Sequence, residues 1–235
     1  MCQDCGCGDP NLVPVELQTR ILARNDDAAA HNRAHFAERG VLAINLMGSP
    51  GSGKTAVLEA TARGVADKSR LAALAGDLAT DNDAARLERA GIRARAITTG
   101  QACHLDAEMV HHELHHLDLG GVEYLFIENV GNLVCPAVYD LGQHANVVVL
   151  SVTEGEDKPL KYPTMFARAD LVLLTKVDLL PYLSIDMRAI YRSLSLVMPN
   201  PTLIPMSSPS GGGLETWIDW LAGRRAAVGA EMVFA

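Results

Sequence analysis

The sequence predicts an α/β fold in which a doubly wound, mostly parallel sheet lies between layers of helices. Short, almost continuous runs of Val, Ile, Leu and Ala alternate with longer amphipathic segments of helical period. Strands that are apolar throughout are covered on both faces, which is typical of parallel sheets. Strands are expected at residues 41–47, 71–75, 95–98, 122–127, 147–152, 171–174 and 202–205. Helices are expected at residues 53–67, 81–90, 106–116, 160–169, 185–198 and 214–225.

Further segments flank the main domain, which is expected to span residues 41–225. Residues 1–13 are rich in Cys and Gly and have no apolar period, so we expect a flexible head. Apolar residues at helical spacing predict a helical extension over residues 14–40, and Gly40 ends it. Residues 226–235 are expected to form a loose tail.

Composition and charge narrow the possible classes of function. Of the 235 residues, 49% are hydrophobic, and the formal net charge is −8. An acidic chain lacks the basic surface that nonspecific binding to nucleic acid requires. No apolar run is long enough to span a bilayer, and the first residues do not have the pattern of a secretory signal. We therefore expect a cytoplasmic protein that binds neither nucleic acid nor membranes.

The clearest motif is a phosphate-binding loop between the expected strand 41–47 and the helix after it. It matches G-x-x-x-x-G-K-[ST] in full with Gly48, Ser49, Pro50, Gly51, Ser52, Gly53, Lys54 and Thr55. Backbone N–H groups of such a loop and the helix N-terminus surround the phosphates. We expect Lys54 to reach the β and γ phosphates and Thr55 to hold Mg²⁺.

Two carboxylates at the ends of expected strands are further candidates for the magnesium site. Glu128 follows the strand 122–127, and Gly131, three residues later, is expected to direct its N–H at the γ phosphate. Asp77 follows the strand 71–75 closely, although either carboxylate could instead cap a helix. Asn132 stands directly after Gly131, and its short side chain predicts slow intrinsic hydrolysis.

A second group of residues predicts a site for guanine. In the sequence Thr-Lys-Val-Asp at 175–178, the carboxylate of Asp178 can accept hydrogen bonds from the guanine N1–H and 2-amino groups. Adenine lacks this pair of donors and would leave the carboxylate unpaired. The aliphatic part of Lys176 can pack on the base. Ser207, before a run of glycines, is a weaker candidate for a second loop that contacts the base.

The five cysteines predict metal sites rather than a disulfide framework. Cys2, Cys5 and Cys7 are close enough in sequence for three thiolates to reach one ion, with the α-amino group as a fourth ligand. A tetragonal arrangement of these ligands suits nickel(II), and a tetrahedral one suits zinc. The alternative interpretation is a disordered head with spare thiols.

Cys103, His104 and Cys135 form a second candidate metal set. Cys103 and His104 follow one expected strand and Cys135 follows another, and both strands are expected to end at the nucleotide side of the sheet. Three soft ligands are incomplete for a closed structural site, so water or a second chain would complete the set. A buried cysteine with a helix-capping histidine is the alternative.

The expected helix 106–116 carries four more histidines. His111 with His115, and His112 with His116, are pairs at spacing i, i+4 that could each bind a metal from one helix face. The two pairs lie on different faces and cannot serve one ion. We favour a solvated helix face as the interpretation.

Through these motifs the chain resembles the HypB family, the nickel-incorporation GTPases of hydrogenase maturation. The resemblance covers nearly the whole chain, and residues 128–136 are its most specific part. The matching segments are the three head cysteines and residues 48–55, 76–81, 103–106, 128–136, 154–159 and 175–178. One departure is Thr175, where Asn is commoner in GTPases.

The resemblance implies a P-loop NTPase of the SIMIBI type that couples GTP hydrolysis to nickel delivery for nickel–iron hydrogenase. It implies a high-affinity nickel site at the cysteine head and a second site for nickel or zinc at Cys103, His104 and Cys135. This second site is implied to lie near a homodimer interface formed with GTP. The implied partners are a HypA-type zinc metallochaperone and, indirectly, the precursor of the hydrogenase large subunit.

These observations lead to the hypothesis of a nucleotide switch. GTP and Mg²⁺ would order Asp77 and the segment 128–135, and loss of the γ phosphate would move Cys135. The rivals are a urease-type nickel GTPase, a small-molecule kinase and a metal sensor with a structural nucleotide. The urease-type motif Cys-Pro-His is absent, because Ala137 follows Cys135-Pro136.

Overall fold

Seven parallel strands form one sheet at the centre of the molecule. The computed structural model describes the backbone of residues 15–233 and the side chains of residues 19–229, so the head cysteines Cys2, Cys5 and Cys7 lie outside the described residues. The strand order is β3-β2-β4-β1-β5-β6-β7. The strands are β1 Leu42–Met47, β2 Leu71–Asp77, β3 Arg93–Thr98, β4 Tyr124–Glu128, β5 Ala145–Ser151, β6 Leu171–Thr175 and β7 Leu203–Pro205.

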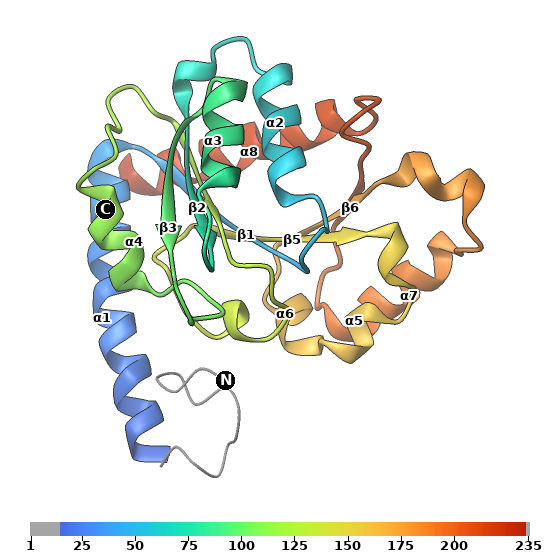
Figure 1. Cartoon of the computed structure of the whole chain (residues 1–235), viewed down its shortest axis with the longest axis horizontal. Coiled ribbons are helices and arrows are strands. Elements are labelled where there is room, and N and C mark those ends of the chain that lie inside the picture. The colour runs from blue at the N-terminus through green and yellow to red at the C-terminus, as the bar shows by residue number, and fades with distance from the viewer. Residues whose placement is uncertain (1–14, 234–235) are drawn as a thin grey trace.

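Helices cover both faces of this sheet (Figure 1). On one face α2, α3 and α8 pack against the alternate strand residues that include Leu42, Ile44 and Leu46. On the other face, α1 and α4 cover β2 to β4, and α6 and α7 cover β5 and β6. The helices are α1 Val15–Arg39, α2 Lys54–Gly64, α3 Asn82–Ala90, α4 Ala107–Leu114, α5 Lys158–Lys161, α6 Pro163–Ala167, α7 Met187–Val197 and α8 Leu214–Val233. The predicted doubly wound α/β class is confirmed, and the described sheet is parallel throughout.

The structure corrects three boundaries. The predicted helix 160–169 is two short helices, α5 and α6, because the backbone at Tyr162 is not helical and Pro163 starts the second helix. Residues 226–233, expected in a loose tail, continue α8, whose 20 residues carry no internal proline. The helix α4 ends at Leu114, with His115 as its C-cap, so His116 lies just beyond it.

All seven strands direct their carboxyl ends to the same edge of the sheet, because they are parallel. Strand β1 lies between β4 and β5, and the chain must pass over β1 to go from one to the other. Parallel α/β sheets bind ligands at such a point of reversal. Residues that follow β1, β2, β4, β5 and β6 are therefore brought together at one edge.

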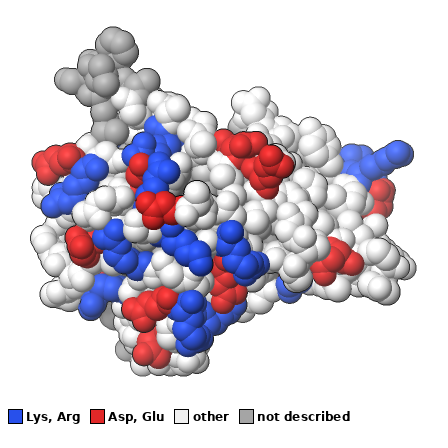
Figure 2. Space-filling model, turned by 90° about the horizontal axis from the view of Figure 1, so that it is seen from above, with Lys and Arg blue, Asp and Glu red and all other residues white. Residues whose placement is uncertain are grey.

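The surface over α2, α3 and α8 carries charges of both signs. In Figure 2 the basic and acidic side chains are interspersed across this face, and no single basic field covers it. The ion pairs Arg86–Glu59 and Arg224–Asp170 are examples of this mixing. Among the described helices, none is both long enough and apolar enough to cross a lipid bilayer.

Trp217 of α8 is the largest fully buried side chain among the described residues. We therefore expect its removal to cause a large loss of stability on this face of the sheet. Its indole nitrogen donates a hydrogen bond to the Thr61 hydroxyl at 2.9 Å, and its ring packs on Phe126. We expect Trp217→Ala to lower the free energy of unfolding by about 3–5 kcal/mol, since a large cavity remains and the Thr61 hydroxyl loses a donor, although it still donates to the Val57 carbonyl. Urea denaturation followed by circular dichroism measures this loss.

Leu196→Ala is the matched control, because this side chain is 76% exposed. We expect its free energy of unfolding to stay within about 0.5 kcal/mol of the parent value. Equal effects of the two substitutions would contradict the assigned packing.

Candidate nucleotide and metal site

The phosphate-binding loop joins β1 to α2 in a conformation that depends on its glycines. Gly53 precedes α2 with a left-handed backbone, φ 102° and ψ 21°. A Cβ on Gly48 would lie 2.3 Å from the carbonyl oxygen of Val149 on β5. Larger residues at either position would distort the loop or push it off the sheet. The N-terminus of α2 thus faces the edge where the strands end.

Lys54 is held inside this loop. It is 7% exposed, and its ammonium lies 3.3 Å from the carbonyl oxygens of both Gly48 and Ser49. Burial lowers the pKa of Lys54, and the nearby carboxylates of Glu128 and Asp83 partly oppose this effect. Both hydrogen bonds are long, so phosphate oxygens can replace the carbonyl oxygens as partners.

Thr55, Asp83 and Glu128 meet directly behind the loop. The Thr55 hydroxyl lies 2.7 Å from Glu128 Oε1 and 3.0 Å from Asp83 Oδ1. Glu128 is 3% exposed, and its Oε2 has no hydrogen-bond partner among the described residues. Burial raises the pKa of Glu128 to about 7, against the Thr55 hydrogen bond and the Lys54 charge, which lower it. An orphaned carboxylate oxygen beside a hydroxyl and a second carboxylate fits a hard divalent cation such as Mg²⁺.

Asp83 was missed by the sequence analysis, which named Asp77 instead. The Asp77 carboxylate accepts hydrogen bonds from the backbone N–H groups of Ala79 and Thr80 at 2.9 Å, and these bonds hold its pKa below the usual value. Asp77 still lines the same cavity of about 480 Å³ as Lys54 and Glu128. Asp83 lies in the first turn of α3, where sequence alone suggests only a favourable charge near a helix N-terminus.

Gly131 and Asn132 press against the phosphate-binding loop. A Cβ on Gly131 would lie 2.9 Å from the backbone nitrogen of Pro50, so only glycine allows this approach. Asn132 forms an isolated β-bridge with Gly48. Its side-chain amide also donates to the carbonyl oxygen of Cys103 at 3.2 Å. One residue therefore contacts both the loop that surrounds phosphate and the segment that carries Cys103.

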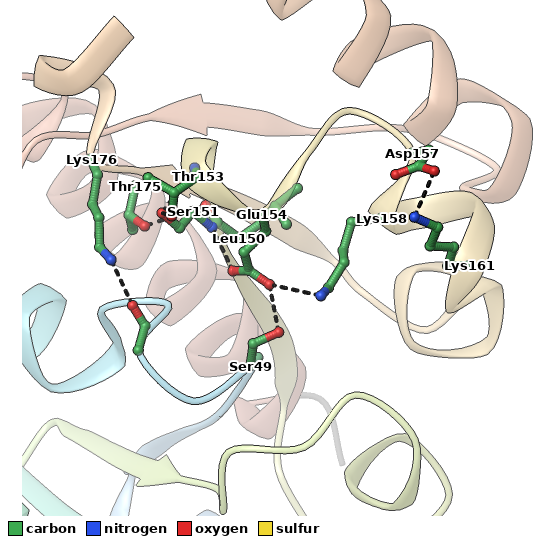
Figure 3. A network of polar contacts seen from close by, with 12 residues as sticks. Ser49, Leu150, Ser151, Thr153, Glu154, Asp157, Lys158, Lys161, Thr175 and Lys176 are labelled. Atoms are coloured by element: carbon green, nitrogen blue, oxygen red, sulfur yellow. Dashed lines mark hydrogen bonds and ion pairs between the residues drawn. The ribbon is translucent and has the colours of Figure 1, made fainter. Parts of the chain in front are cut away.

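Thr175 and Lys176, the first two residues of the predicted guanine motif, contact the phosphate-binding loop from the end of β6 (Figure 3). The Thr175 hydroxyl donates to the carbonyl oxygen of Ser52 at 2.6 Å, and the Lys176 ammonium donates to that of Gly51 at 2.8 Å. Lys176 is the one described residue other than glycine with a positive φ, at 60°. Thr175 thus secures the loop from β6, and the side chain of Lys176 extends along the loop surface.

Asp178 and Ser207 belong to neighbouring loops. Asp178 is exposed at the start of the 3₁₀ turn Val177–Tyr182, while Ser207 is buried. The Val177 N–H donates to the carbonyl oxygen of Met206 at 3.4 Å, which connects the two loops. The Ser207 hydroxyl accepts from the Ser210 N–H, so its visible role is to shape its own loop. The structure therefore brings Asp178 next to the predicted second loop, with its carboxylate open to a ligand.

Glu154 is a second residue whose role the sequence analysis did not assign. One oxygen of its carboxylate accepts from the Ser151 N–H at 2.9 Å, and the other accepts from the Ser49 hydroxyl at 2.5 Å (Figure 3). The ammonium of Lys158 lies 3.5 Å from the same oxygen as Ser49. Only 12% of the Glu154 side chain is exposed. This network fixes the first residues of the phosphate-binding loop to the end of β5.

Cys103, His104 and Cys135 meet at the same edge of the sheet. The two sulfur atoms are 3.2 Å apart, and the Cys103 sulfur lies 4.0 Å from His104 Nδ1. In the part of the chain that the structure describes, this is the one group of three His, Cys, Asp or Glu ligand atoms within 4.8 Å of one another. Two sulfurs and one imidazole nitrogen are ligands that nickel(II) and zinc accept.

The surroundings of the cluster support metal binding. The His104 ring stacks on Tyr139 with centroids 4.0 Å apart, and burial lowers the pKa of His104, which favours the neutral imidazole that a metal needs. Cys135 begins a 3₁₀ turn that follows directly from the segment of Gly131 and Asn132. Val134 beside it is 57% exposed. His104 and Cys135 are buried and Cys103 is partly exposed, so a further ligand could approach the group from the side of Cys103.

A strand, a glycine-dependent loop and a helix in the arrangement that binds phosphate define a P-loop nucleotide-binding protein, here with the Cys103, His104 and Cys135 side chains gathered beside the loop. The profile of the CobW/HypB/UreG nucleotide-binding domain family matches residues 42–201. The chain belongs to this family and, within it, to the HypB proteins. The predicted resemblance is thereby confirmed.

Curated relatives and solved structures agree with this assignment. The chain is 49% identical over 215 residues to the hydrogenase maturation factor HypB of Rhizobium leguminosarum bv. viciae, covering 90% of this chain and 72% of the relative. It is also 49% identical to HypB of Escherichia coli strain K12, covering 91% of this chain and 73% of the relative. The crystal structure of HypB from Helicobacter pylori in complex with nickel superimposes with a TM-score of 0.83 at 39% identity, over 87% of this chain and 96% of that one.

The contact between Thr175 and Ser52 predicts how nucleotide binding depends on β6. In Thr175→Val the shape is kept, but the buried carbonyl of Ser52 loses its donor, at a cost of about 1–2 kcal/mol. We expect nucleotide affinity to fall roughly 5- to 30-fold, with unchanged preference among bases. Titration with a fluorescent guanine or adenine nucleotide measures both quantities.

Thr175→Ser retains the hydroxyl and serves as the control, so its affinity should stay close to that of the parent. An unchanged affinity in Thr175→Val would show that β6 does not order the loop.

Proposed function

We propose that this chain is a GTP-hydrolysing nickel metallochaperone that delivers nickel during maturation of nickel–iron hydrogenase. The observation that carries the proposal is Asn132, whose backbone pairs with Gly48 of the phosphate-binding loop and whose amide holds the carbonyl of Cys103. Its HypB relatives are hydrogenase maturation factors, which supplies the biological setting, and the nickel complex of the Helicobacter pylori protein supplies the ion. A nucleotide state that moves Asn132 would also move a metal ligand.

Guanine specificity is supported by the exposed carboxylate of Asp178 beside the Ser207 loop. A carboxylate can accept from both N1–H and the 2-amino group of guanine, whereas adenine offers no such pair. Lys176 runs from the same motif to the carbonyl of Gly51, so its stem can form a platform for the base. We therefore assign GTP and GDP as the nucleotides.

For hydrolysis, each residue has a role that follows from its position. Lys54 would neutralise charge on the β and γ phosphates, and the Gly131 N–H would face the γ phosphate. Mg²⁺, held by Thr55, Glu128 and Asp77 or Asp83, would supply charge neutralisation between the phosphates. Asn132 follows Gly131 and is engaged with Cys103, so it is poorly placed to orient water. We therefore expect slow turnover, as in a switch.

Metal and nucleotide binding would be coupled through residues 128–135. GTP would draw Gly131 toward the γ phosphate and hold Asn132 and Cys135 in place for nickel or zinc. Hydrolysis would release this segment, weaken the metal set of Cys103, His104 and Cys135, and allow transfer. By linkage, nickel must then favour the GTP state by the same factor as GTP favours nickel binding.

A homodimer promoted by GTP or metal would complete the three-ligand set. Val134 and Val138 lie on either side of the 3₁₀ turn that begins at Cys135, and Leu78 lines the nucleotide cavity. All three are exposed apolar side chains and would be covered in such a dimer. The cysteines of the head would provide the high-affinity nickel site. We place the protein in the cytoplasm, with a HypA-type zinc metallochaperone as direct partner and the precursor of the hydrogenase large subunit as indirect recipient.

Asp178 predicts a change of nucleotide preference. In Asp178→Asn the side-chain amide presents a donor to the guanine donors, and two charge-assisted hydrogen bonds are lost, so GTP affinity should fall roughly 100-fold or more. Xanthosine triphosphate, which carries an oxygen at position 2, should bind the variant better than the parent. Competition against a fluorescent nucleotide measures both affinities. Retained GTP preference in the variant would refute guanine recognition by Asp178.

Substitution of Asn132 is expected to abolish the coupling between nucleotide binding and metal binding. In the parent we expect nickel to bind roughly 5- to 150-fold more tightly with a nonhydrolysable GTP analogue than with GDP, the usual range of allosteric coupling. In Asn132→Ala this ratio should fall toward one, because the amide no longer holds Cys103. A variant that lacks residues 1–8 has no head cysteines, so a nickel titration of this variant reports on the second site alone.

Cys135→Ser is the control, since it should weaken nickel binding in both nucleotide states while GTP affinity without nickel is retained. A parent with equal nickel affinity in GDP and in the analogue would remove the switch.

A further inference from the structure

A second group of histidines lies away from the nucleotide edge, where α4 packs on α1 (Figure 1). The packing is fixed by Asn25 and Asn32 of α1. Asn25 accepts from the Ala107 N–H at 2.9 Å, and the amide of Asn32 donates to the carbonyl oxygen of Ala107 at 2.9 Å. On the outer side of this seam lie His111 and His115.

The two imidazoles already converge. Nε2 of His111 and Nε2 of His115 are 3.2 Å apart, and the rings meet edge to face with centroids 4.8 Å apart. Two nitrogens that each lie about 2.0–2.1 Å from one metal ion are separated by roughly 3 Å when they occupy adjacent coordination positions. The observed separation therefore matches that of a metal-bound pair, without a change in helix geometry.

Asn32 determines which nitrogen of His111 is available. The side chain is fully buried, and its amide group uses both hydrogens, toward the carbonyl oxygens of Ala107 and Leu141. Its oxygen, 3.0 Å from His111 Nδ1, can therefore only accept. Nδ1 of His111 must carry the hydrogen, and in the neutral ring Nε2 then presents a lone pair to His115. A buried partner that orients an imidazole in this way is typical of metal ligands.

We propose that His111 and His115 bind one divalent transition-metal ion through their Nε2 atoms, with water in the remaining positions. Imidazole nitrogen suits nickel(II), zinc and copper(II), and disfavours magnesium. His115 is exposed and His111 is half-buried, so an ion from solution reaches the pair directly. With only two protein ligands, the site is weaker and faster to exchange than the cluster of Cys103, His104 and Cys135.

The other histidine pair on this segment is a built-in comparison. His112 and His116 also have the spacing i, i+4, but their ring centroids are 5.1 Å apart and no nitrogen contact joins them. His112 Nδ1 faces the Glu113 carboxylate at 3.1 Å, and no buried amide orients its ring. Spacing alone does not distinguish the pairs, whereas the fixed tautomer and the converging nitrogens favour His111 and His115.

His35 of α1 is the nearest further imidazole. Its pKa is lowered first by burial, then by the charge of Arg39, and then by His115 and His111, so its ring lies within electrostatic reach of the pair. It is not within ligand distance, because among the side chains of residues 19–229 the one group of three candidate ligands is Cys103, His104 and Cys135. Neither His111 nor His115 contacts the nucleotide site, so this proposal is independent of the proposed function.

The test is a titration of the full chain with ZnCl₂, monitored by long-range ¹H–¹⁵N correlation of the imidazole nitrogens. Zinc is diamagnetic, and each histidine reports separately, so binding at the cysteines does not obscure the result. We expect Nε2 of His111 and His115 to shift with one common midpoint while Nδ1 of His111 stays protonated. The midpoint should be the same with GDP and with a GTP analogue.

Variants define the outcomes. In His115→Gln, the response of His111 should require at least tenfold more zinc, because one ligand remains. In His116→Gln the response of His111 and His115 should be unchanged. Absence of Nε2 shifts at millimolar zinc, a His111 midpoint that is unchanged in His115→Gln, or tighter binding at His112 and His116 would each overturn the proposal.

Discussion

The close contact of residues 131 and 132 with the phosphate-binding loop is the constraint on which both sites depend. Gly131 approaches Pro50 so closely that no side chain fits between them, and Asn132 pairs with Gly48. Strand β4 leads into this segment beside β1, so the sheet register holds the contact in place. Because the same segment continues into Cys135, the nucleotide site and the group of Cys103, His104 and Cys135 share one short stretch of backbone.

The fold and the residues of local motifs could be predicted from the sequence, because both depend on patterns within a few residues. The apolar runs predicted the positions of the strands, and the motif at residues 48–55 predicted the position of the nucleotide site. Cys103, His104 and Cys135 were also anticipated, since they follow strands that end at one edge. The predicted helix 160–169 and the tail were wrong in their limits, because a single proline and tertiary packing decide such boundaries.

The contacts that were missed join residues distant in sequence. Asp83 reaches Thr55 across 28 positions, and Glu154 reaches Ser49 across 105. No local sequence motif identifies the contact partner of Asp83 or of Glu154. These two contacts are therefore visible only in the folded structure. Thr175 is the instructive case, because the sequence analysis noted it only as a departure from the commoner Asn. In the structure its hydroxyl secures the loop through Ser52.

Burial of Glu128 carries a free-energy cost in the ligand-free chain. A carboxylate that is 3% exposed, with one oxygen unpartnered among the described residues, is costly to bury. A cation that satisfies this oxygen binds only the native chain, so it shifts the unfolding equilibrium toward the folded form. Proteases act on the unfolded fraction, and that fraction would grow if nucleotide and the proposed magnesium ion were withdrawn. The lifetime of the chain in a cell would therefore follow the cell's supply of these two ligands.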